Sequence, residues 1–269
     1  VTATDSQKVP NASATSASSG ADINGAAIMN ATAQMRERLK PVAARMLGCN
    51  ADDVNFADNA AHGGGKSVHW ADLTKQAWLD RVGLSVTGFY MTPEIKYDFM
   101  TLQGRAFYYY CYGAALSEVE IDTRTGEWWL KAADIVHDVG TSINPAIDRG
   151  QVEGAYIQGM GWLTMEECIW DKKGKLLTHG PSTYKIPVAG DVPEHFNVTL
   201  FNGKNIKPTP FNSKATGEPP LMLGLSSFFA LRDAVAASAD HKAVVNMSAP
   251  ATPERILMAC EAAKQAAKV

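Results

Sequence analysis

The apolar positions from Leu221 to Ala237 predict a helix. The pair Pro219–Pro220 stands just before them, and prolines suit the first positions of a helix because their φ angle is preset and they have no N–H to leave unpaired. Within the stretch only Arg232 and Asp233 carry charge. A helix that is apolar on nearly every face is typical of the interior of a large protein. We therefore expect a buried helix that begins directly after Glu218.

Other segments also show clear periodicity. Apolar residues at helical spacing predict three further helices, from Asp22 to Leu47 with a bend or interruption at Pro41, from Gln151 to Cys168, and from Pro253 to Lys268. Two strand-like segments flank the turn residues Asp122–Glu127, and they predict a hairpin formed by Phe107–Ile121 and Trp128–Val136. Strands and turns, with a tight turn at Asp171–Gly174, are expected after the helix that ends at Cys168, as far as Leu200.

Three local features each allow two interpretations. Gly63–Gly65 could be a flexible connection or a loop that holds phosphate, although no G-K-[ST] signature follows. Tyr108–Tyr110 could be a packed strand or an aromatic platform for stacking. Because glycine is a poor helix former, the glycines at 154, 159 and 161 indicate that another backbone or a ligand comes close to their helix.

Composition narrows the classes of function. The chain has 269 residues, of which 46% are hydrophobic and 20% charged, so it can bury a substantial core. A net charge of -3 gives no basic footprint for nucleic acid. No uninterrupted apolar run reaches the about 18 residues of a membrane span, so we expect no membrane partner.

Cysteine and histidine spacing predicts no metal site formed by protein side chains. The four cysteines are scattered without a C-x-x-C pair, and the six histidines form no H-E-x-x-H pattern. We expect reduced, buried thiols, and we expect His137 and His179 to be packed or surface residues and not ligands. An iron–sulfur cluster or structural zinc within the chain is not expected.

Two positions suggest chemistry. Glu218 would lie at the positive end of the expected helix, which favours a charged carboxylate, so it suits a base in a dry pocket. Its alternative role is a plain acidic cap of the helix. In Thr15–Ser18, small side chains let backbone N–H groups approach an anionic ligand, and the helix that begins near Asp22 adds its dipole. The alternative for this segment is an ordinary loop.

Several long strings of residues closely resemble the molybdopterin-binding part of the xanthine dehydrogenase/oxidase family. Together they cover most of residues 5 to 240, and some are longer than ten residues, which makes the resemblance specific. The strings are Val9–Ser19, Gly88–Tyr90 with Thr92–Pro93, Tyr112–Ala115, Asp138–Gly161, Gly180–Pro187 and Gly217–Pro220.

The resemblance implies roles for particular residues. Glu218 would be the catalytic base. The molybdenum cofactor, whose metal is held by its pterin and not by side chains, would be contacted by Thr15, Ser16, Ala17, Ser18, Gln151, Gly217 and Glu218. This chain has Ala12 where threonine is common in relatives and Gly20 where some have serine. Those two departures put individual hydrogen bonds in doubt, and not the site.

The resemblance further implies an α+β fold with mixed sheets and helices in repeated two-layer units. We expect the C-terminal part of a molybdenum subunit, with approximate lobes 1–85 plus 201–269 and 86–200, whose N-terminal part is missing from this chain. The implied reaction oxidises hypoxanthine and xanthine toward urate with oxygen from water. Electrons would pass to 2Fe-2S clusters and FAD on partner domains or chains and then to NAD, in a cytoplasmic, higher-order oligomer.

Two other functions stay open. The chain could come from a relative that oxidises aldehydes or other N-heterocycles, because such an enzyme would keep the same base and loop. It could also be a noncatalytic assembly fragment that only completes the fold of another subunit.

Overall fold

The computed structural model of the protein describes residues 5–7 and 16–268. The chain divides into two compact units, Val1–Ser19 with Tyr109–Val269, and Gly20–Tyr108. Residues 201–269 thus share a unit with residues 109–200, a grouping that differs from the lobes expected above. The lobe division of the larger fold stays a prediction.

The first unit contains a mixed sheet of three strands, in the order β6 (Gly113–Ile121), β7 (Trp128–His137) and β8 (His195–Leu200). β6 and β7 are antiparallel, and β7 and β8 are parallel. The Asp122–Glu127 turn joins β6 to β7, as expected, and the backbone N–H of Asp122 donates to Glu127 O at 2.8 Å. The first strand of this hairpin, β6, begins at Gly113 and not at Phe107. The interpretation of Tyr108–Tyr110 as part of a strand is therefore wrong.

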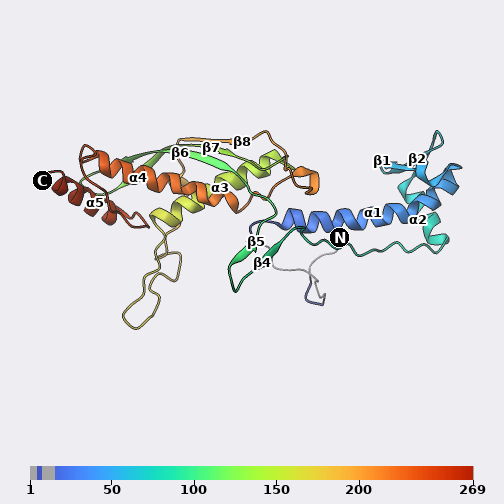
Figure 1. Ribbon diagram of the computed structural model, residues 1–269, viewed down its shortest axis with the longest axis horizontal. Coiled ribbons are helices and arrows are strands. Elements are labelled where there is room, and N and C mark those ends of the chain that lie inside the picture. Colours follow the sequence, from blue (N-terminus) through green and yellow to red (C-terminus); the bar gives the residue numbers. More distant parts are fainter. Residues whose placement is uncertain (1–4, 8–15, 269) are drawn as a thin grey trace. The chain divides into compact units, whose positions relative to one another are not determined.

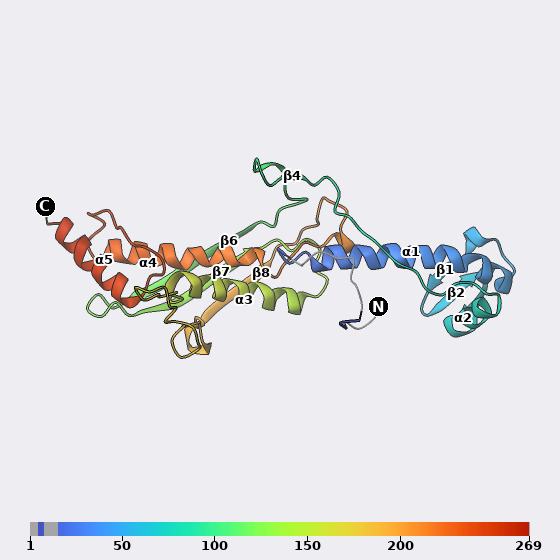
Figure 2. The same cartoon turned by 90° about the horizontal axis from the view of Figure 1, so that it is seen from below.

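Helices cover one face of this sheet (Figures 1 and 2). They are α3 (Pro145–Thr164), α4 (Leu225–Ala237) and the short 3-10 segment η4 (Pro219–Gly224), and α5 (Pro253–Ala266) packs on α4. Alternate residues of the strands point toward α3 and form a core with it, comprising Leu130, Ala133, Ile135, Val152, Tyr156, Met160 and Val198. This arrangement of a mixed sheet and one helical layer confirms the expected α+β class.

Glycines allow α3 and η4 to cross at close range. A Cβ on Gly159 would lie 2.1 Å from Leu221 O, and one on Gly224 would lie 2.5 Å from Met160 N. Gly161 is crowded by the ring of Pro187, whereas a Cβ on Gly154 would have no neighbour within 4 Å. The close approach predicted from these glycines therefore occurs at two of the three positions, and the neighbour at both is protein.

α3 begins at Pro145, six residues before the expected start, and ends at Thr164. Asn144 caps it, because its side chain accepts a hydrogen bond from Ile147 N at 3.3 Å. α5 has the expected start, since the Thr252 side chain accepts from Arg255 N. The short segments η2 (Ala189–Asp191) and η3 (Pro210–Asn212) lie in the loops on either side of β8.

The second unit has its own core. α1 (Gly20–Leu47) runs without interruption through Pro41. It packs with α2 (Trp70–Leu79) and with an antiparallel sheet of β1 (Asn55–Ala57), β2 (Ala60–Gly63) and β3 (Lys66–His69) around a core that includes Leu39, Val42, Leu47, Val54, Ala61, Leu73 and Ala77. The remaining elements are η1 (Ala51–Asp53) and the hairpin of β4 (Lys96–Asp98) and β5 (Gln103–Arg105).

The glycines at 63–65 end β2 and form its turn into β3, where Gly64 and Gly65 have φ angles of 55° and 74°. Gly63–Gly65 is therefore a connection within a hairpin. The left-handed backbone of this turn explains why glycine is needed there.

The helix after Glu218 differs from expectation in form and in burial. Its first six residues are η4, and the α-helix α4 starts only at Leu225. In α4 only Ser227, Leu231 and Val235 are buried, while 54% of Phe229 is exposed. The expected all-round burial is thus wrong for this chain, because the sheet and α5 cover a single face of α4. By length and composition alone, Pro219–Ala237 would be able to span a membrane, which the charge-interrupted pattern had not suggested.

Candidate functional site

The small-residue loop near the start of the chain forms a tight turn in its described part. Ser19 N donates to Ser16 O at 3.2 Å. Ala17 and Ser18 both have left-handed backbones, with φ angles of 51° and 56°. Such a conformation is uncommon in residues other than glycine and occurs where surroundings fix the backbone. Thr15, the first of the four loop residues expected to contact cofactor, lies outside the described residues.

Glu218 lies against this loop. The backbone N–H of Ser18 donates to Glu218 Oε1 at 3.2 Å, across 200 residues of sequence. Glu218 occupies the N-cap position of η4, yet its side chain makes no capping hydrogen bond. The carboxylate is exposed in this chain, and not buried as expected. The geometry therefore connects Glu218 to the loop and does not support the interpretation as a plain helix cap.

Gly217 shows how closely three of the expected site segments converge. A Cβ at this position would lie 2.7 Å from Ser18 Oγ and 3.0 Å from Gln151 Oε1. Gln151 is in the second turn of α3, and Gly217 directly precedes Glu218. The structure thus brings Ser18, Gln151, Gly217 and Glu218 together, with Ser16 and Ala17 adjacent in sequence to Ser18.

The groups at this site fit an anionic organic cofactor that brings its own metal. They are a backbone turn of small residues, a side-chain amide and a carboxylate, and the missing Cβ of Gly217 lets Ser18 and Gln151 come close to its backbone. Among the residues that the structure describes, no three His, Cys, Asp or Glu side chains are grouped so that they could hold a metal ion.

A buried ion pair lies close in sequence to the site. Lys214 Nζ is 2.5 Å from Asp138 Oδ2, and only 8% and 15% of these side chains are exposed. Asp138 begins one of the strings that resemble the family and Lys214 lies outside them, and nothing in the sequence indicated that the two residues pair. Their pairing depends on the bridge between Gly140 and Ser213, which only the folded chain shows.

His137 directly precedes Asp138, and the sequence predicted that it is a packed or surface residue and not a ligand. Its side chain is buried, and neither ring nitrogen has a hydrogen-bond partner in the described part of the protein. Burial lowers the pKa of the imidazole from its usual 6.5, Asp138 raises it, and Lys214 lowers it further. Of the two expected environments, packed or surface, the structure shows the packed one for His137.

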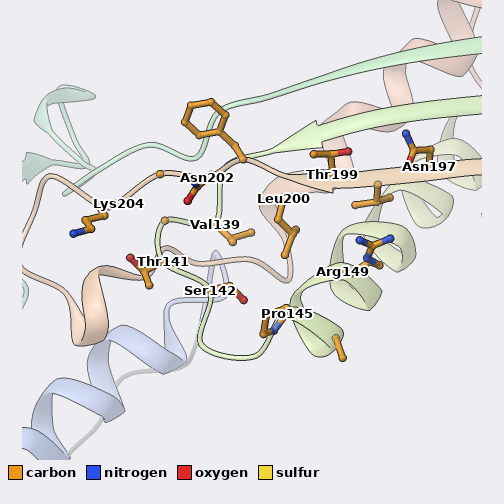
Figure 3. Close-up of a pocket in the computed structure, with 15 residues that line it drawn as sticks. Val139, Thr141, Ser142, Pro145, Arg149, Asn197, Thr199, Leu200, Asn202 and Lys204 are labelled. Atoms are coloured by element: carbon orange, nitrogen blue, oxygen red, sulfur yellow. The ribbon is translucent and has the colours of Figure 1, made fainter.

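A separate cavity of about 780 Å³ lies between the loop 139–142, the start of α3 and the end of β8 (Figure 3). Arg149 from α3 and Lys204 from the loop after β8 give it positive charge. None of the expected site residues lines this cavity. Much of its lining belongs to the string Asp138–Gly161, in which the sequence pattern singled out no cavity.

Relatives of known function match nearly the whole chain. Identity is 42% over 270 residues to the xanthine dehydrogenase of Oryza sativa subsp. japonica and 44% over 266 residues to the xanthine dehydrogenase/oxidase of Felis catus. Both alignments cover 97% of this chain, but only 18% of the first relative and 19% of the second. The chain thus spans less than a fifth of the length of these relatives.

Solved structures have the same fold. The quinoline 2-oxidoreductase of Pseudomonas putida 86 superposes with a TM-score of 0.72 at 28% identity, over 92% of this chain and 30% of that one. A Cu,Mo-CO dehydrogenase gives a TM-score of 0.67 at 22% identity, over 89% of this chain and 29% of its own, which shows the fold alone.

The model of the molybdopterin cofactor-binding domain family matches residues 1–193, well over half of the chain. This match includes the loop at Ser16–Ser18 and Gln151, two of the segments that converge at Gly217. The chain therefore belongs to the molybdopterin cofactor-binding domain family, and the resemblance to xanthine dehydrogenases seen in its sequence is confirmed.

Proposed function

We propose that this chain forms part of the molybdenum site of a hydroxylase of the xanthine dehydrogenase type, which oxidises hypoxanthine and xanthine toward urate with oxygen from water. The observation that carries the proposal is the hydrogen bond from Ser18 N to Glu218 Oε1, which joins the candidate base to the candidate cofactor loop. Identity of 42–44% to xanthine dehydrogenases over 97% of the chain supports the choice of substrate.

In this proposal the residues around Gly217 hold the molybdopterin. Ser16, Ala17 and Ser18 present backbone and hydroxyl groups, Gln151 presents its amide, and Gly217, which has no Cβ, allows Ser18 and Gln151 to come close together. When bound, the cofactor supplies the two-electron oxidation of the substrate carbon. The contribution of the chain is to fix and orient it, because a static arrangement of polar groups avoids reorganisation during the reaction.

Glu218 acts as the general base. Its carboxylate accepts the proton that is released when water supplies the oxygen atom of the product. The hydrogen bond from Ser18 N fixes one carboxylate oxygen, so the side chain is held at the cofactor loop. Since the carboxylate is exposed in this chain, substrate and proton can reach it.

Replacing the carboxylate tests this role. We expect Glu218→Gln and Glu218→Ala to retain molybdenum while kcat falls about 10²- to 10⁴-fold, the usual contribution of a general base. The matched control is Glu261→Gln, an exposed glutamate on α5, which should leave kcat unchanged. Metal content and turnover would be measured on the same preparations of the assembled enzyme. Normal kcat in a molybdenum-replete Glu218→Gln enzyme would refute the assignment.

The substrate is tested with dye reduction driven by xanthine, by quinoline and by an aldehyde. Turnover of xanthine with molybdenum near one per chain would support the purine assignment. Other N-heterocycles are the second candidate, because the chain is 28% identical to a quinoline 2-oxidoreductase over 92% of its length. Faster turnover of quinoline or an aldehyde than of xanthine would refute the purine assignment. A folded complex without molybdenum would favour the noncatalytic assembly fragment.

The same proposal includes the partners that the chain needs. Because the chain spans under a fifth of its relatives, the remaining pocket would come from the N-terminal part of the molybdenum subunit, and electrons would leave through 2Fe-2S clusters and FAD to NAD. We also propose a cytoplasmic, oligomeric enzyme without nucleic-acid or membrane partners.

A further inference from the structure

The Glu218 carboxylate accepts a hydrogen bond from Ser18 N, and its position also depends on the backbone that carries it. That backbone is anchored at Lys214, four residues earlier, whose side chain is only 8% exposed. Four residues span at most about 14 Å when extended, so whatever fixes Lys214 also limits where Glu218 can lie.

Lys214 is fixed by three kinds of contact. Its ammonium forms the buried ion pair with Asp138, donates to Tyr110 O at 2.9 Å, and lies 5.3 Å from the centre of the Tyr112 ring. Its backbone N–H donates to Val139 O at 2.8 Å. A buried ammonium with a charged partner and a carbonyl acceptor has little freedom to move, because every alternative position would leave a charge unpaired away from water.

The next residue, Ala215, is held by Tyr109 and Cys111. Ala215 N donates to Tyr109 Oη at 2.8 Å, and Cys111 Sγ donates to Ala215 O at 3.1 Å. Asp138 is itself fixed, since its backbone N–H donates to Tyr112 O and its Oδ1 accepts from Gly140 N, each at 2.8 Å. The polar contacts of residues 214 and 215 are thus made with residues 109–112 and 138–140.

We propose that Lys214, through its ion pair with Asp138, is a positioning residue that holds the segment 214–218 so that Glu218 reaches the loop at Ser18. The Lys214 side chain stabilises the start of the segment, Tyr109 and Cys111 hold Ala215, and the contact between Gly217 and Ser18 sets the far end. The effect on catalysis rests on the proposed function, whereas the effect on the backbone does not.

Three variants of the assembled enzyme separate positioning from stability. Lys214→Met removes the ammonium but leaves Asp138 as a buried, unpaired charge. Adding Asp138→Asn removes that charge, and the asparagine Oδ1 can still accept from Gly140 N. Lys214→Arg keeps the charge. The control is Arg255→Met, which breaks the partly buried ion pair of Arg255 with Glu167 in the same unit, away from the segment 214–218.

The first readout is hydrogen–deuterium exchange, with and without cofactor. In Lys214→Met and in the double variant we expect the amides of residues 215–218 to exchange about tenfold faster or more, while those of β6 and β7 keep their protection. Lys214→Arg should restore part of the protection. Arg255→Met should leave residues 215–218 unchanged even if it lowers the melting temperature.

The second readout is the kinetics of molybdenum-replete enzyme. A displaced base should lower kcat roughly 10- to 100-fold with a smaller change in KM, and should alter the pH dependence of kcat. The double variant should regain thermal stability without regaining kcat. Unchanged exchange at residues 215–218, or kcat that recovers along with stability in the double variant, would overturn the proposal. If Glu218→Gln proved fully active, the proposed function would fail, but the exchange result would still decide the role of Lys214.

Discussion

At the scale of single residues, the site depends on what is small or missing as much as on what is charged. Gly217 has space for a hydrogen but not for a methyl group, because Ser18 and Gln151 occupy the position of a Cβ. The resemblance in the sequence named these residues, yet it could not show that the loop and α3 meet at Gly217. That contact joins residues far apart along the chain, and no local pattern encodes it.

Gly217→Ala should weaken cofactor binding. The added Cβ must push Ser18 Oγ and Gln151 Oε1 aside, and both are expected to contact the cofactor. We expect the molybdenum content of purified enzyme to fall several-fold, by analogy with the 10- to 100-fold costs of disturbing the outer contacts of a metal site. Gly190→Ala is the control, since nothing lies within 4 Å of its Cβ. Full molybdenum content in Gly217→Ala would show that the site tolerates the displacement.

His137 should make the first unit sensitive to acid. Burial lowers the pKa of its imidazole below 6.5 in the folded state, whereas the unfolded chain takes up a proton near 6.5. The unfolded state therefore binds more protons below that pH, and stability falls as the pH drops below 6.5 toward the folded-state pKa. Between about pH 7.5 and about pH 5.5 the midpoint of urea unfolding should fall, and His137→Met should reduce this fall. An equal fall in both proteins would exclude His137 as its source.

At the scale of elements, starts and turns were predictable because their signals are local. Thr252 and the proline after it mark the start of α5, and Asp122–Glu127 marks the hairpin turn. Burial of α4 was not predictable, because its apolar composition cannot tell which face this chain covers. The short strands β1 to β5 were missed for a related reason, since three or four residues are too few to show a period.

The crossing of α3 and η4 should be sensitive to a single methyl group. In Gly159→Ala the new Cβ would meet Leu221 O at 2.1 Å, so the two backbones must separate. We expect a loss of about 1–3 kcal/mol in the free energy of unfolding, the usual cost of overpacking. Gly154→Ala, in the same helix but with open space at its Cβ, should instead stabilise by up to about 1 kcal/mol through helix propensity. Urea unfolding of both variants would measure these changes in the free energy of unfolding. Equal changes in the two variants would contradict the close crossing of α3 and η4.

At the scale of the whole molecule, the chain has separate hydrophobic cores. One surrounds Leu39, Leu47 and Leu73 in the unit Gly20–Tyr108, and others lie around the three-stranded sheet and between α4 and α5. The sequence predicted enough apolar residues for a large core, but not their division, because composition does not record which helix packs on which sheet.

Leu73→Ala should therefore act on one unit only. Leu73 is fully buried in the core of Gly20–Tyr108, and removing such a side chain costs about 2–5 kcal/mol. We expect faster amide exchange in α1 and α2, with protection in β6 and β7 unchanged. Ile256→Ala in α5 should show the reverse pattern. Loss of protection throughout the chain in either variant would mean that the two units unfold as one.

The contact between Ser18 and Glu218 also sets an order of events during synthesis. The two residues are 200 positions apart, and ribosomes add about 5 to 20 residues per second, so roughly 10 to 40 s pass between the appearance of the loop and that of its partner. Throughout this interval the nascent chain holds only half of the site. A cofactor that needs both halves could be held only after the ribosome has passed residue 218, so its insertion would follow the synthesis of the whole intervening segment.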